Sequence, residues 1–421
     1  MARTVNIGFL GCGNIGCGVW HLLQDISGEI ESRAGLRFEV KRVLVRNPEK
    51  NRGIDAPREL FTTNVNEVIH DPDITIVMEF LGGDEPAHAY VVEALRAGKT
   101  VVTANKVAFA LHWHEYHQAA RESGSGLYYE AAVCGAIPII HALEDSLQAN
   151  RIDQVFGIVN GTTNYILSRM SAEGADYQDV LADAQRLGLA EPDPSSDVEG
   201  YDAAYKLSIL STLAFHGHVP FEHLYVEGIT RMQAEDIRIT SQLGYCVKLL
   251  AIAKSDGEKV EARVHPTLIR KEHPLSNVSG AFNAVFLHGH ACGDMMFMGR
   301  GAGDMPTASA LVSDLERAAE AQRHKYPTFE DETVMERNGD WECPFYLRVT
   351  AADHAGVLGA IAQTFARFGI SIASMQQMSA KDGRATLVFL THRAHENAMQ
   401  EALKALPGET VHVKALIRME E

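Results

Sequence analysis

The stretch Thr4-Val-Asn-Ile-Gly-Phe-Leu-Gly-Cys-Gly-Asn-Ile-Gly16 decides how the first part of the chain folds. It joins a short apolar strand, residues 4–10, to a glycine-rich turn, and a helical pattern of apolar residues follows directly. The spacing Gly-x-Gly-x-x-Gly allows a tight turn and the binding of a pyrophosphate at a helix N-terminus. Because the motif lies between a strand and a helix, it predicts a dinucleotide site rather than a glycine-rich turn without a ligand. The residues expected to contact the cofactor are Gly11, Gly13, Asn14, Ile15 and Gly16.

A cation follows the second predicted strand, residues 38–45. In dinucleotide-binding domains this position usually carries an acid when the cofactor is NAD, because a carboxylate accepts hydrogen bonds from the ribose hydroxyls. Here Arg46 takes that place, and a guanidinium suits a 2′-phosphate. We therefore expect NADP as the cofactor, with NAD as the alternative.

Strand and helix patterns continue to alternate through the first part of the chain. Residues 74–80 and 100–103 are predicted strands, each followed by a helical pattern. This alternation predicts a parallel, doubly wound sheet whose ligand lies beyond the carboxyl ends of the strands. Lys106 stands at such an end and opens a helix, where a lysine opposes the helix dipole. An anion or a reacting carbonyl would explain its position; a solvent-facing lysine is the alternative.

The middle of the chain has a different pattern. A strand is predicted over residues 151–159, and a hairpin over residues 245–269 turns at Asp256-Gly257. Further strand patterns continue to residue 297, so this region is predicted to be α+β. Pro306 lies near the first turn of a later helix, which is expected to pack back onto the first domain.

A charge-rich stretch, EPDPSSDVEGYDAAYK, ends at Lys206. Ser196 and Glu199 have the spacing of a capping box, which predicts one helix from about residue 198 to residue 216. Asp202 and Lys206 then lie four residues apart on one helical face. On its own such a pair indicates only a surface salt bridge. With a cofactor loop elsewhere in the chain, a catalytic pair becomes the competing interpretation.

The chain of 421 residues carries a formal charge of −17, which argues against nucleic acid or an anionic membrane as the main partner. The N-terminus lacks a signal-peptide pattern, and no stretch of about 18 uncharged apolar residues occurs, so we expect a cytoplasmic protein. The six cysteines are scattered without Cys-x-x-Cys spacing, which favours reduced thiols over disulfides or a zinc site.

Six motifs together resemble the motif series of homoserine dehydrogenases, in the same order across residues 1 to about 320. They are GFLGCGNIG, VVTANK, EAAVCGAIP, NGTTNYIL, EPDPSSDVEGYDAAYKL and GRGAGDMPTASA. Residues 345–421 have the order of a ferredoxin-like βαββαβ fold and resemble an ACT-type amino-acid-sensing domain, as carried by the long monofunctional members. The family usually has Asp-Arg-Pro-Gly where this chain has Asp353-His-Ala-Gly356.

The resemblance implies NAD(P)H-dependent reduction of aspartate 4-semialdehyde to homoserine, on the route to threonine and methionine. Lys206 is then the proton donor, directly or through a water, and Lys106 holds the substrate and polarises its oxygen. Asp202 orients the reacting oxygen and pairs with a lysine, while Glu191 accepts from the substrate ammonium and Thr162 lies in the substrate cleft. Two neighbouring ammonium groups are expected to lower each other's pKa, which would make a lysine a better acid near neutral pH.

The resemblance also implies a monovalent-cation site, usually for sodium, since backbone carbonyls suit such a hard ion. Its ligands would be the carbonyl or carboxylate of Glu130 and the carbonyls of Val133, Gly135 and Ile137. Cys134 replaces a common glycine in this loop. The resemblance also implies cofactor contacts at Gly188 and Gly303, which lie outside the first domain, and at Lys106 within it.

We therefore expect an α/β protein with a Rossmann-type dinucleotide-binding domain over residues 1–140, completed by about residues 305–325. An α+β substrate-binding and dimerisation domain should span residues 141–304, followed by a linker over residues 326–344 and the ACT-type domain over residues 345–421. The resemblance implies threonine as effector and a homodimer or homotetramer.

Two alternatives remain at this point. One is another amino-acid or hydroxyacid dehydrogenase built on the same cofactor domain, because a fold does not fix a substrate. The other is an amino-acid-binding regulatory protein that retains a vestigial dehydrogenase body. For the C-terminal module, a merely structural dimerisation domain is the alternative to effector binding.

Overall fold

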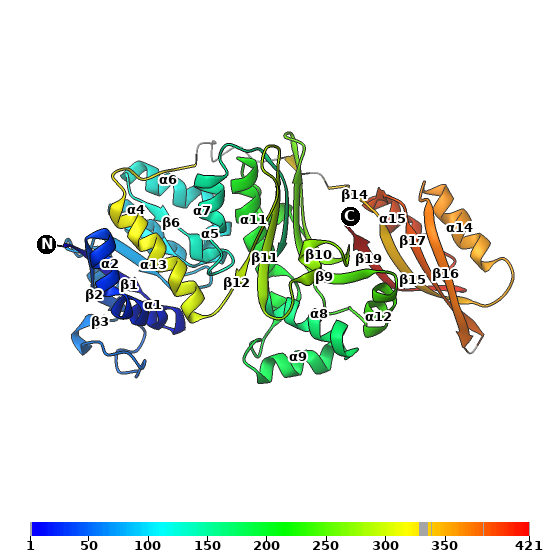
Figure 1. Ribbon diagram of the computed structural model, residues 1–421, viewed down its shortest axis with the longest axis horizontal. Coiled ribbons are helices and arrows are strands. Elements are labelled where there is room, and N and C mark those ends of the chain that lie inside the picture. Colours follow the sequence, from blue (N-terminus) through cyan, green and yellow to red (C-terminus); the bar gives the residue numbers. More distant parts are fainter. Residues whose placement is uncertain (1, 328–335, 338, 382, 421) are drawn as a thin grey trace.

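The computed structural model describes residues 2–327, 336–337, 339–381 and 383–420. Three sheet-based units follow one another along the longest axis of the molecule (Figure 1). A parallel sheet flanked by helices forms the N-terminal end, a mixed unit lies in the middle, and a sheet with two helices forms the C-terminal end. Among the described residues, every helix is too short or too polar to cross a lipid bilayer.

The N-terminal sheet has six strands in the order β3-β2-β1-β4-β5-β6, and all of its strand pairs are parallel. The strands are β1 (Arg3–Leu10), β2 (Leu36–Leu44), β3 (Phe61–Thr62), β4 (Ile76–Glu79), β5 (Thr100–Thr103) and β6 (Leu127–Tyr128). Helices cover the sheet, so its strands are apolar on both faces and Ile7, Phe9 and Leu10 are fully buried. The strand order reverses between β1 and β4, which confirms the doubly wound sheet and opens a crevice at their carboxyl ends.

A helix from much later in the chain completes this unit. The local helices are α1 (Asn14–Asp25), α2 (Ser27–Ala34), α3 (Asn66–Ile69), α4 (Ala87–Arg96), α5 (Lys106–Leu111) and α6 (Trp113–Ser123). Helix α13 (Asp304–Glu320) lies beside α1 (Figure 1), and its Ala308 and Leu311 share an apolar cluster with Val19 and Trp20. The contact is so close that a Cβ on Gly18 would lie 3.1 Å from the Asp304 carbonyl oxygen.

The middle unit consists of an antiparallel sheet with helices against it. In sheet order its strands are β12 (Gly293–Arg300), β11 (Phe282–Gly289), β7 (Ile152–Ile158), β9 (Tyr245–Ser255) and β10 (Lys259–Arg270). Its helices are α7 (Ile139–His141), α8 (Gly161–Glu173), α9 (Tyr177–Arg186), α10 (Ser195–Val198), α11 (Tyr201–Phe215) and α12 (Ala234–Gln242). Over the whole molecule, short helical turns lie at Arg58–Leu60 in the N-terminal unit and, later in the chain, at Glu130–Ala132, Ala142–Ser146, Phe221–His223 and Pro274–Asn277. The predicted hairpin turning at Asp256-Gly257 is present as β9 and β10.

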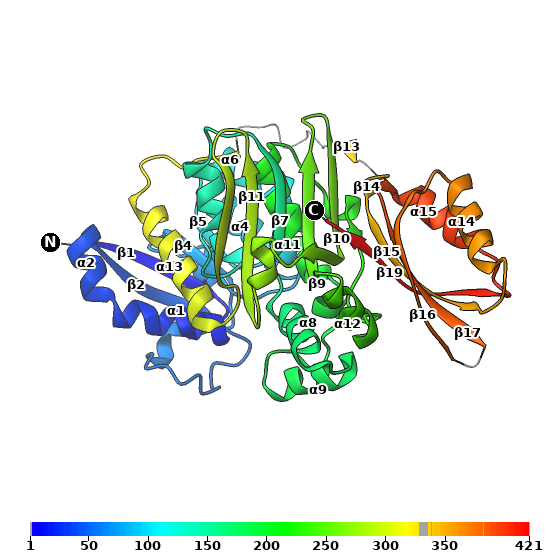
Figure 2. The ribbon, with the colours of Figure 1, turned by 45° about the vertical axis from the view of Figure 1, so that its right-hand side comes forward.

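The C-terminal unit has the predicted βαββαβ order (Figure 2). Its elements are β15 (Phe345–Ala352), α14 (Val357–Arg367), β16 (Ile372–Lys381), β17 (Arg384–Thr391), α15 (Glu396–Lys404) and β19 (Val411–Met419). The antiparallel strand order β19-β15-β17-β16 and a separate apolar core around Phe345, Ile361 and Phe389 confirm the ferredoxin-like plan.

The C-terminal sheet continues the middle sheet. Strand β19 pairs in parallel with β10, where Thr267 lies opposite Arg418, and the Glu420 amide donates to the Leu268 carbonyl at 2.9 Å. Four more short strands are present: β8 (Tyr225–Val226) and β13 (Glu336–Arg337) pair with β10, and β14 (Glu342–Cys343) pairs with β18 (Ala394–His395). Part of the predicted linker is therefore paired, while its residues 328–335 and 338 lie outside the described residues.

The helix predicted from about residue 198 to residue 216 is present as α11, but it begins only at Tyr201, because the chain breaks at Gly200 after the short helix α10. Gly200 is left-handed, with φ of 89°, and neither helix has a side-chain cap, so the Ser196–Glu199 capping box does not form. The Val198 carbonyl instead accepts from the Ile229 amide at 2.8 Å. A loop from elsewhere in the chain thus takes the hydrogen bond that would have continued the helix.

Candidate active site

A cleft of about 1050 Å³ lies where the carboxyl ends of the first sheet meet the middle unit. Both units contribute to its lining. The predicted site residues that line it are Gly13, Asn14, Ile15, Lys106, Gly135, Thr162, Gly188, Glu191, Asp202, Lys206 and Gly303. The predicted residues outside this lining are Gly11, Gly16, Arg46, Glu130, Val133 and Ile137. The cleft thus joins the predicted cofactor loop to the charge-rich stretch that ends at Lys206.

In the glycine-rich loop, Gly11 and Gly16 pack against neighbouring residues, whereas Gly13 faces the cleft. A Cβ on Gly11, whose φ is 101°, would lie 3.3 Å from the Phe80 backbone, and one on Gly16 would lie 3.1 Å from the Phe80 ring. Gly13 caps α1, and a Cβ there would meet nothing within 4 Å. Open space therefore faces the first-turn amides of α1, which suits a phosphate. The loop fits a dinucleotide on these grounds.

Two arginines lie near this loop, and only one was expected. Arg46 is exposed just beyond β2 and makes no hydrogen bond or ion pair with other described residues. Arg52 donates from Nε to the Cys12 carbonyl at 3.2 Å and from Nη2 to the Asn47 carbonyl at 2.8 Å. The sequence carried no signal for Arg52, because it lies in an irregular segment and is fixed by backbone carbonyls.

The three predicted catalytic side chains meet at Asp202. Its Oδ2 lies 2.7 Å from Lys206 Nζ, and its Oδ1 lies 3.2 Å from Lys106 Nζ. The Asp202 and Lys206 side chains are 8% and 10% exposed, whereas that of Lys106 is 34% exposed. Lys206 also donates to the Val159 carbonyl at 2.8 Å. One buried carboxylate therefore holds two ammonium groups, each carried by a different unit.

Burial alone would raise the pKa of Asp202, but the charges of Lys206 and Lys106 outweigh it and hold that pKa well below its usual range. Burial alone would lower the pKa of Lys206, but the adjacent Asp202 carboxylate raises it above its usual value. The expected lowering of the lysine pKa is therefore wrong for Lys206. The reason is geometric: the carboxylate lies between the two ammonium groups and stabilises the charge on each.

Three family models match the chain in order: the NAD-binding domain of homoserine dehydrogenase at residues 11–130, homoserine dehydrogenase at residues 138–315, and the ACT domain at residues 345–408. The homoserine dehydrogenase of Bacillus subtilis (strain 168) is 41% identical over 427 residues, which cover 99% of each chain. The chain belongs to the homoserine dehydrogenase family. That of Synechocystis sp. is 43% identical over 96% of each chain.

Solved homoserine dehydrogenases have the same fold. The crystal structure of the enzyme from Thiobacillus denitrificans superposes with a TM-score of 0.93 at 40% identity, covering 100% of this chain and 99% of that one. A hyperthermophilic archaeal homoserine dehydrogenase in complex with NADPH superposes with a TM-score of 0.65 at 26% identity, covering 77% of this chain and 100% of that one. The protein is thus an NAD(P)-dependent oxidoreductase acting on the CH–OH group of homoserine, with a C-terminal ACT domain, and both alternative identities are set aside.

Asn160 is a site residue of this homoserine dehydrogenase that the sequence did not reveal. Its Oδ1 caps α8 by accepting from the Thr163 amide at 2.9 Å. Its Nδ2 donates to Asp202 Oδ2 at 2.8 Å and to Asp197 Oδ1 at 2.7 Å. Burial raises the pKa of Asp197, and the charge of Asp202 adds to this. An Asn before a helix signals a cap, but nothing local signals a partner 42 residues away.

The two remaining residues predicted to contact substrate, Thr162 and Glu191, also line the cleft. Thr162 donates its hydroxyl to the Leu189 carbonyl at 2.8 Å, which ties the start of α8 to the Gly188 turn. Glu191 is exposed, and its backbone carbonyl accepts from Gln185 Nε2 at 3.1 Å. The carboxylate of Glu191 is therefore held near the cleft through its backbone, while its side chain remains open to solvent.

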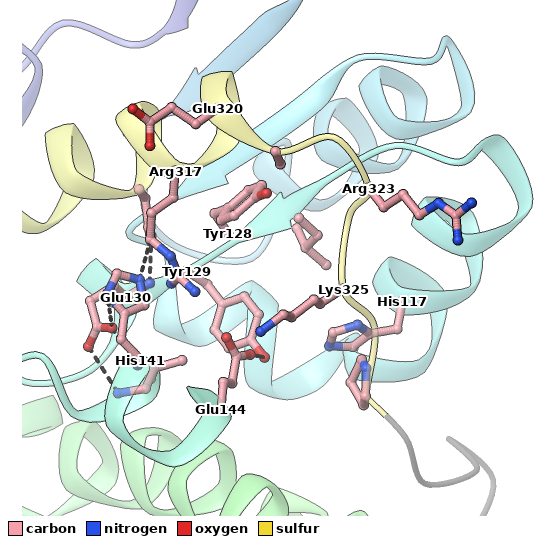
Figure 3. Close-up of a pocket in the computed structure, with 15 residues that line it drawn as sticks. His117, Tyr128, Tyr129, Glu130, His141, Glu144, Arg317, Glu320, Arg323 and Lys325 are labelled. Carbon is pink, nitrogen blue, oxygen red and sulfur yellow. Dashed lines mark hydrogen bonds and ion pairs between the residues drawn. The ribbon is translucent and has the colours of Figure 1, made fainter. Parts of the chain in front are cut away.

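Figure 3 shows that the Glu130 side chain points toward His141, in a second pocket of about 290 Å³. Its carboxylate accepts from the Ile140 amide at 3.0 Å and from the His141 amide at 2.7 Å. Burial raises the pKa of Glu130 to about 7. The adjacent Cys134 and Gly135 line the main cleft, so the loop lies between the two cavities. With this carboxylate engaged by α7, a cation in the loop would depend on backbone carbonyls.

Proposed function

We propose that this enzyme reduces L-aspartate 4-semialdehyde to L-homoserine with NADPH as the preferred cofactor, as a step toward threonine and methionine. The observation that carries the proposal is the Asp202 carboxylate, which binds Lys206 at 2.7 Å and Lys106 at 3.2 Å beside the glycine-rich loop. Two cations in one cleft support the proposal, because an aldehyde oxygen that gains negative charge needs such groups nearby.

When bound, the nicotinamide supplies a hydride to the aldehyde carbon, and the oxygen then becomes an alkoxide. Lys206 donates a proton to that oxygen, directly or through a water. Its raised pKa keeps it protonated before the reaction, and the proton moves because an alkoxide is a far stronger base than an amine. Lys106, the more exposed of the two lysines, polarises the carbonyl and holds the substrate. Asp202 keeps both ammonium groups in place between turnovers.

The substrate is an amino acid, so its ammonium group needs an acceptor. We assign this role to Glu191, whose exposed carboxylate lies at the cleft, with Thr162 as a neighbouring contact. Gly188 and Gly303 give the cofactor close approach from the middle unit, since both line the cleft and have positive φ.

The proposed preference for NADPH rests on Arg46. Replacing it in Arg46→Asp removes the cation and introduces repulsion with a 2′-phosphate, so the ratio of kcat/KM for NADPH over NADH should fall at least about tenfold. Arg52→Gln is the comparison, because Arg52 lies nearby but is engaged by backbone carbonyls. An unchanged ratio in Arg46→Asp would mean that the phosphate is recognised elsewhere.

Regulation, the cation and assembly complete the proposal. We assign threonine as the inhibitor sensed by the ACT domain, because an enzyme early on the route is the one at which an end product acts efficiently. Sodium is assigned to the carbonyls of Glu130, Val133, Gly135 and Ile137. We further propose a cytoplasmic homodimer or homotetramer.

A single assay tests the central proposal. Purified enzyme is given NADP+ with homoserine, malate or aspartate in separate reactions. The absorbance of NADPH is followed with and without threonine. We expect turnover with homoserine only, and inhibition by threonine. Equal rates with malate would refute the substrate assignment, and full activity at saturating threonine would refute the effector.

A further inference from the structure

Glu79 is a fully buried carboxylate at the centre of the N-terminal sheet. It ends β4 and lies opposite Leu10 of β1 and Thr103 of β5. Its Oε1 accepts from the Leu81 amide at 2.6 Å and from the Gly82 amide at 3.3 Å, and its Oε2 accepts from the Thr103 hydroxyl at 2.6 Å. Among the described residues it has no ion-pair partner.

A buried acid without a countercharge is unfavourable by itself, so its contacts must compensate. Burial raises the pKa of Glu79, and the hydrogen bonds from Thr103 and the two amides oppose that rise. Neighbouring positions of the same sheet, Leu10 and Val102, are fully buried and apolar. The three donors therefore point to a use for the carboxylate beyond closing the core.

One group of contacts fixes the loop that follows β4. By accepting from the Leu81 and Gly82 amides, Glu79 bends the chain directly after the strand. The glycine-rich loop rests on this bend, because a Cβ on Gly11 would lie 3.2 Å from the Leu81 side chain. Phe80, in the same bend, lines the cleft.

The other contact leads to Lys106. While donating to Glu79, the Thr103 hydroxyl accepts from the Asn105 amide at 3.0 Å. The Asn105 side chain caps α5 by accepting from the Ala108 amide at 3.2 Å, and it donates to the Gly83 carbonyl at 2.8 Å. Lys106 is the first residue of α5. A continuous chain of hydrogen bonds thus runs from Glu79 through Thr103 to Asn105, the residue directly before Lys106.

We propose that Glu79 is a positioning residue for hydride transfer: it holds the loop after β4 and the start of α5 in one fixed relation, so that Lys106 meets Asp202. This inference rests on the proposed function, because it gives Lys106 a role in that reaction. Glu79 does not itself line the cleft and is not assigned a contact with substrate or cofactor.

Two substitutions interrupt the chain from opposite ends. Glu79→Gln keeps an oxygen for the Leu81 and Gly82 amides but replaces the acceptor of the Thr103 hydroxyl with a donor. Thr103→Val removes that hydroxyl with little change in shape, and Thr103→Ser retains it. Glu144→Gln is the matched control, because Glu144 also accepts from a hydroxyl, that of Tyr129 at 2.8 Å, but among the described residues it has no hydrogen bond to the loop after β4 or to the start of α5.

The measurements are kcat and KM for homoserine and NADP+, alone and combined with Lys106→Met. We expect Glu79→Gln and Thr103→Val each to lower kcat at least about tenfold, since small misplacements of a reacting group have large effects on rate. Thr103→Ser and Glu144→Gln should stay near wild type. Added to Lys106→Met, either substitution should have little further effect, whereas a merely structural role would give additive losses.

The outcomes separate this inference from the proposed function. If Lys106→Met is severely impaired while Glu79→Gln and Thr103→Val turn over normally, the positioning role is refuted and the proposed function stands. Additive losses in the double variants also refute it, since Glu79 would then not act through Lys106. Normal turnover in Lys106→Met refutes both this inference and the proposed role of that lysine.

Discussion

At the scale of single residues, Asp202 organises the charges of the cleft. Among the described side chains it is the only group that contacts both Lys106 and Lys206. Asn160 donates a further hydrogen bond to its Oδ2 and so helps to fix the carboxylate. The same carboxylate that holds the lysines also raises the pKa of Lys206. Lys206 therefore stays protonated until a strongly basic oxygen takes its proton.

The role of Lys206 is tested by Lys206→Ala. Because a proton donor acts in the transition state, kcat should fall by about 10²- to 10⁴-fold while the dissociation constant for NADPH stays close to wild type. Lys99→Met is the matched control: counted over the whole residue both lysines are 8% exposed, but Lys99 donates to the Ile74 carbonyl, away from the cleft. Near-normal kcat in Lys206→Ala would remove its assignment as proton donor.

The charge of Asp202 should set the pH range of activity. In Asp202→Asn, Lys206 keeps its burial but loses the carboxylate that raises its pKa, so that pKa should fall. Reduction needs the ammonium form, and the rate should therefore decline at a lower pH than in wild type. The pH dependence of kcat for aldehyde reduction gives the shift directly. Asp197 has a hydrogen bond to Asn160 but none to Lys206, so Asp197→Asn should shift the pH dependence of kcat less. The same pH dependence in wild type, Asp202→Asn and Asp197→Asn would contradict this account.

At the scale of elements, the start of α11 is set by a loop from outside the helix. The Ile229 amide takes the Val198 carbonyl, and Gly228 packs so closely that a Cβ there would lie 2.1 Å from the same oxygen. The helix therefore restarts at Tyr201, which places Asp202 in its first turn and Lys206 one turn later. The positions of Asp202 and Lys206 depend on this loop contact.

Gly228→Ala tests that dependence. The added methyl must displace the Val198–Glu199 backbone, which should lower the free energy of unfolding by about 1–3 kcal/mol and reduce kcat through movement of α11. Chemical denaturation and steady-state kinetics measure the two effects. Gly359→Ala serves as control, because a Cβ there meets nothing within 4 Å and its backbone is helical. If both variants behave alike, the loop does not position the helix.

The sequence predicted the elements well where the signal was local. Strand β1, the glycine loop and α1 follow from hydrophobic periodicity and glycine spacing, and Asp202 with Lys206 follows from helical spacing. What failed depended on distant residues. The break at Gly200 requires a loop from Gly228, and Asn160 reaches Asp202 only once the fold is formed. The sign of the Lys206 pKa shift likewise depends on Asp202 lying between two lysines, which spacing along the chain does not specify.

At the scale of the whole molecule, the ACT domain is attached through buried charges as well as through the β10–β19 pair. Arg418 of β19 is bidentate to Glu396 and donates to Glu227 Oε2 at 2.7 Å. Arg348 of β15 is bidentate to Asp236 of α12, at 2.6 and 2.9 Å. Glu227 directly precedes the Gly228–Ile229 contact with Val198, so one ion pair connects the sheet of the ACT domain to the loop at the start of α11.

We therefore expect Glu227→Gln to weaken the response to threonine more than the reaction itself. Without the charge of Glu227, Arg418 loses its ion pair with the loop that contacts Val198. The threonine concentration for half-inhibition should then rise at least about fivefold, a typical size for allosteric coupling. Glu342→Gln is the control, since Glu342 pairs with His395 at 3.0 Å on the exposed surface of the same region. Unchanged inhibition in Glu227→Gln would place the coupling elsewhere.

The packing of α13 on α1 has a consequence for the order of events during synthesis. The apolar face of α1, with Val19 and Trp20, is covered by a helix that begins only at Asp304. At about 5–20 residues per second, the roughly 280 intervening residues take roughly 15–60 s to emerge from the ribosome. Throughout that interval the apolar face of α1 in the nascent cofactor domain is uncovered, so we expect a fragment that ends after the sixth strand to aggregate.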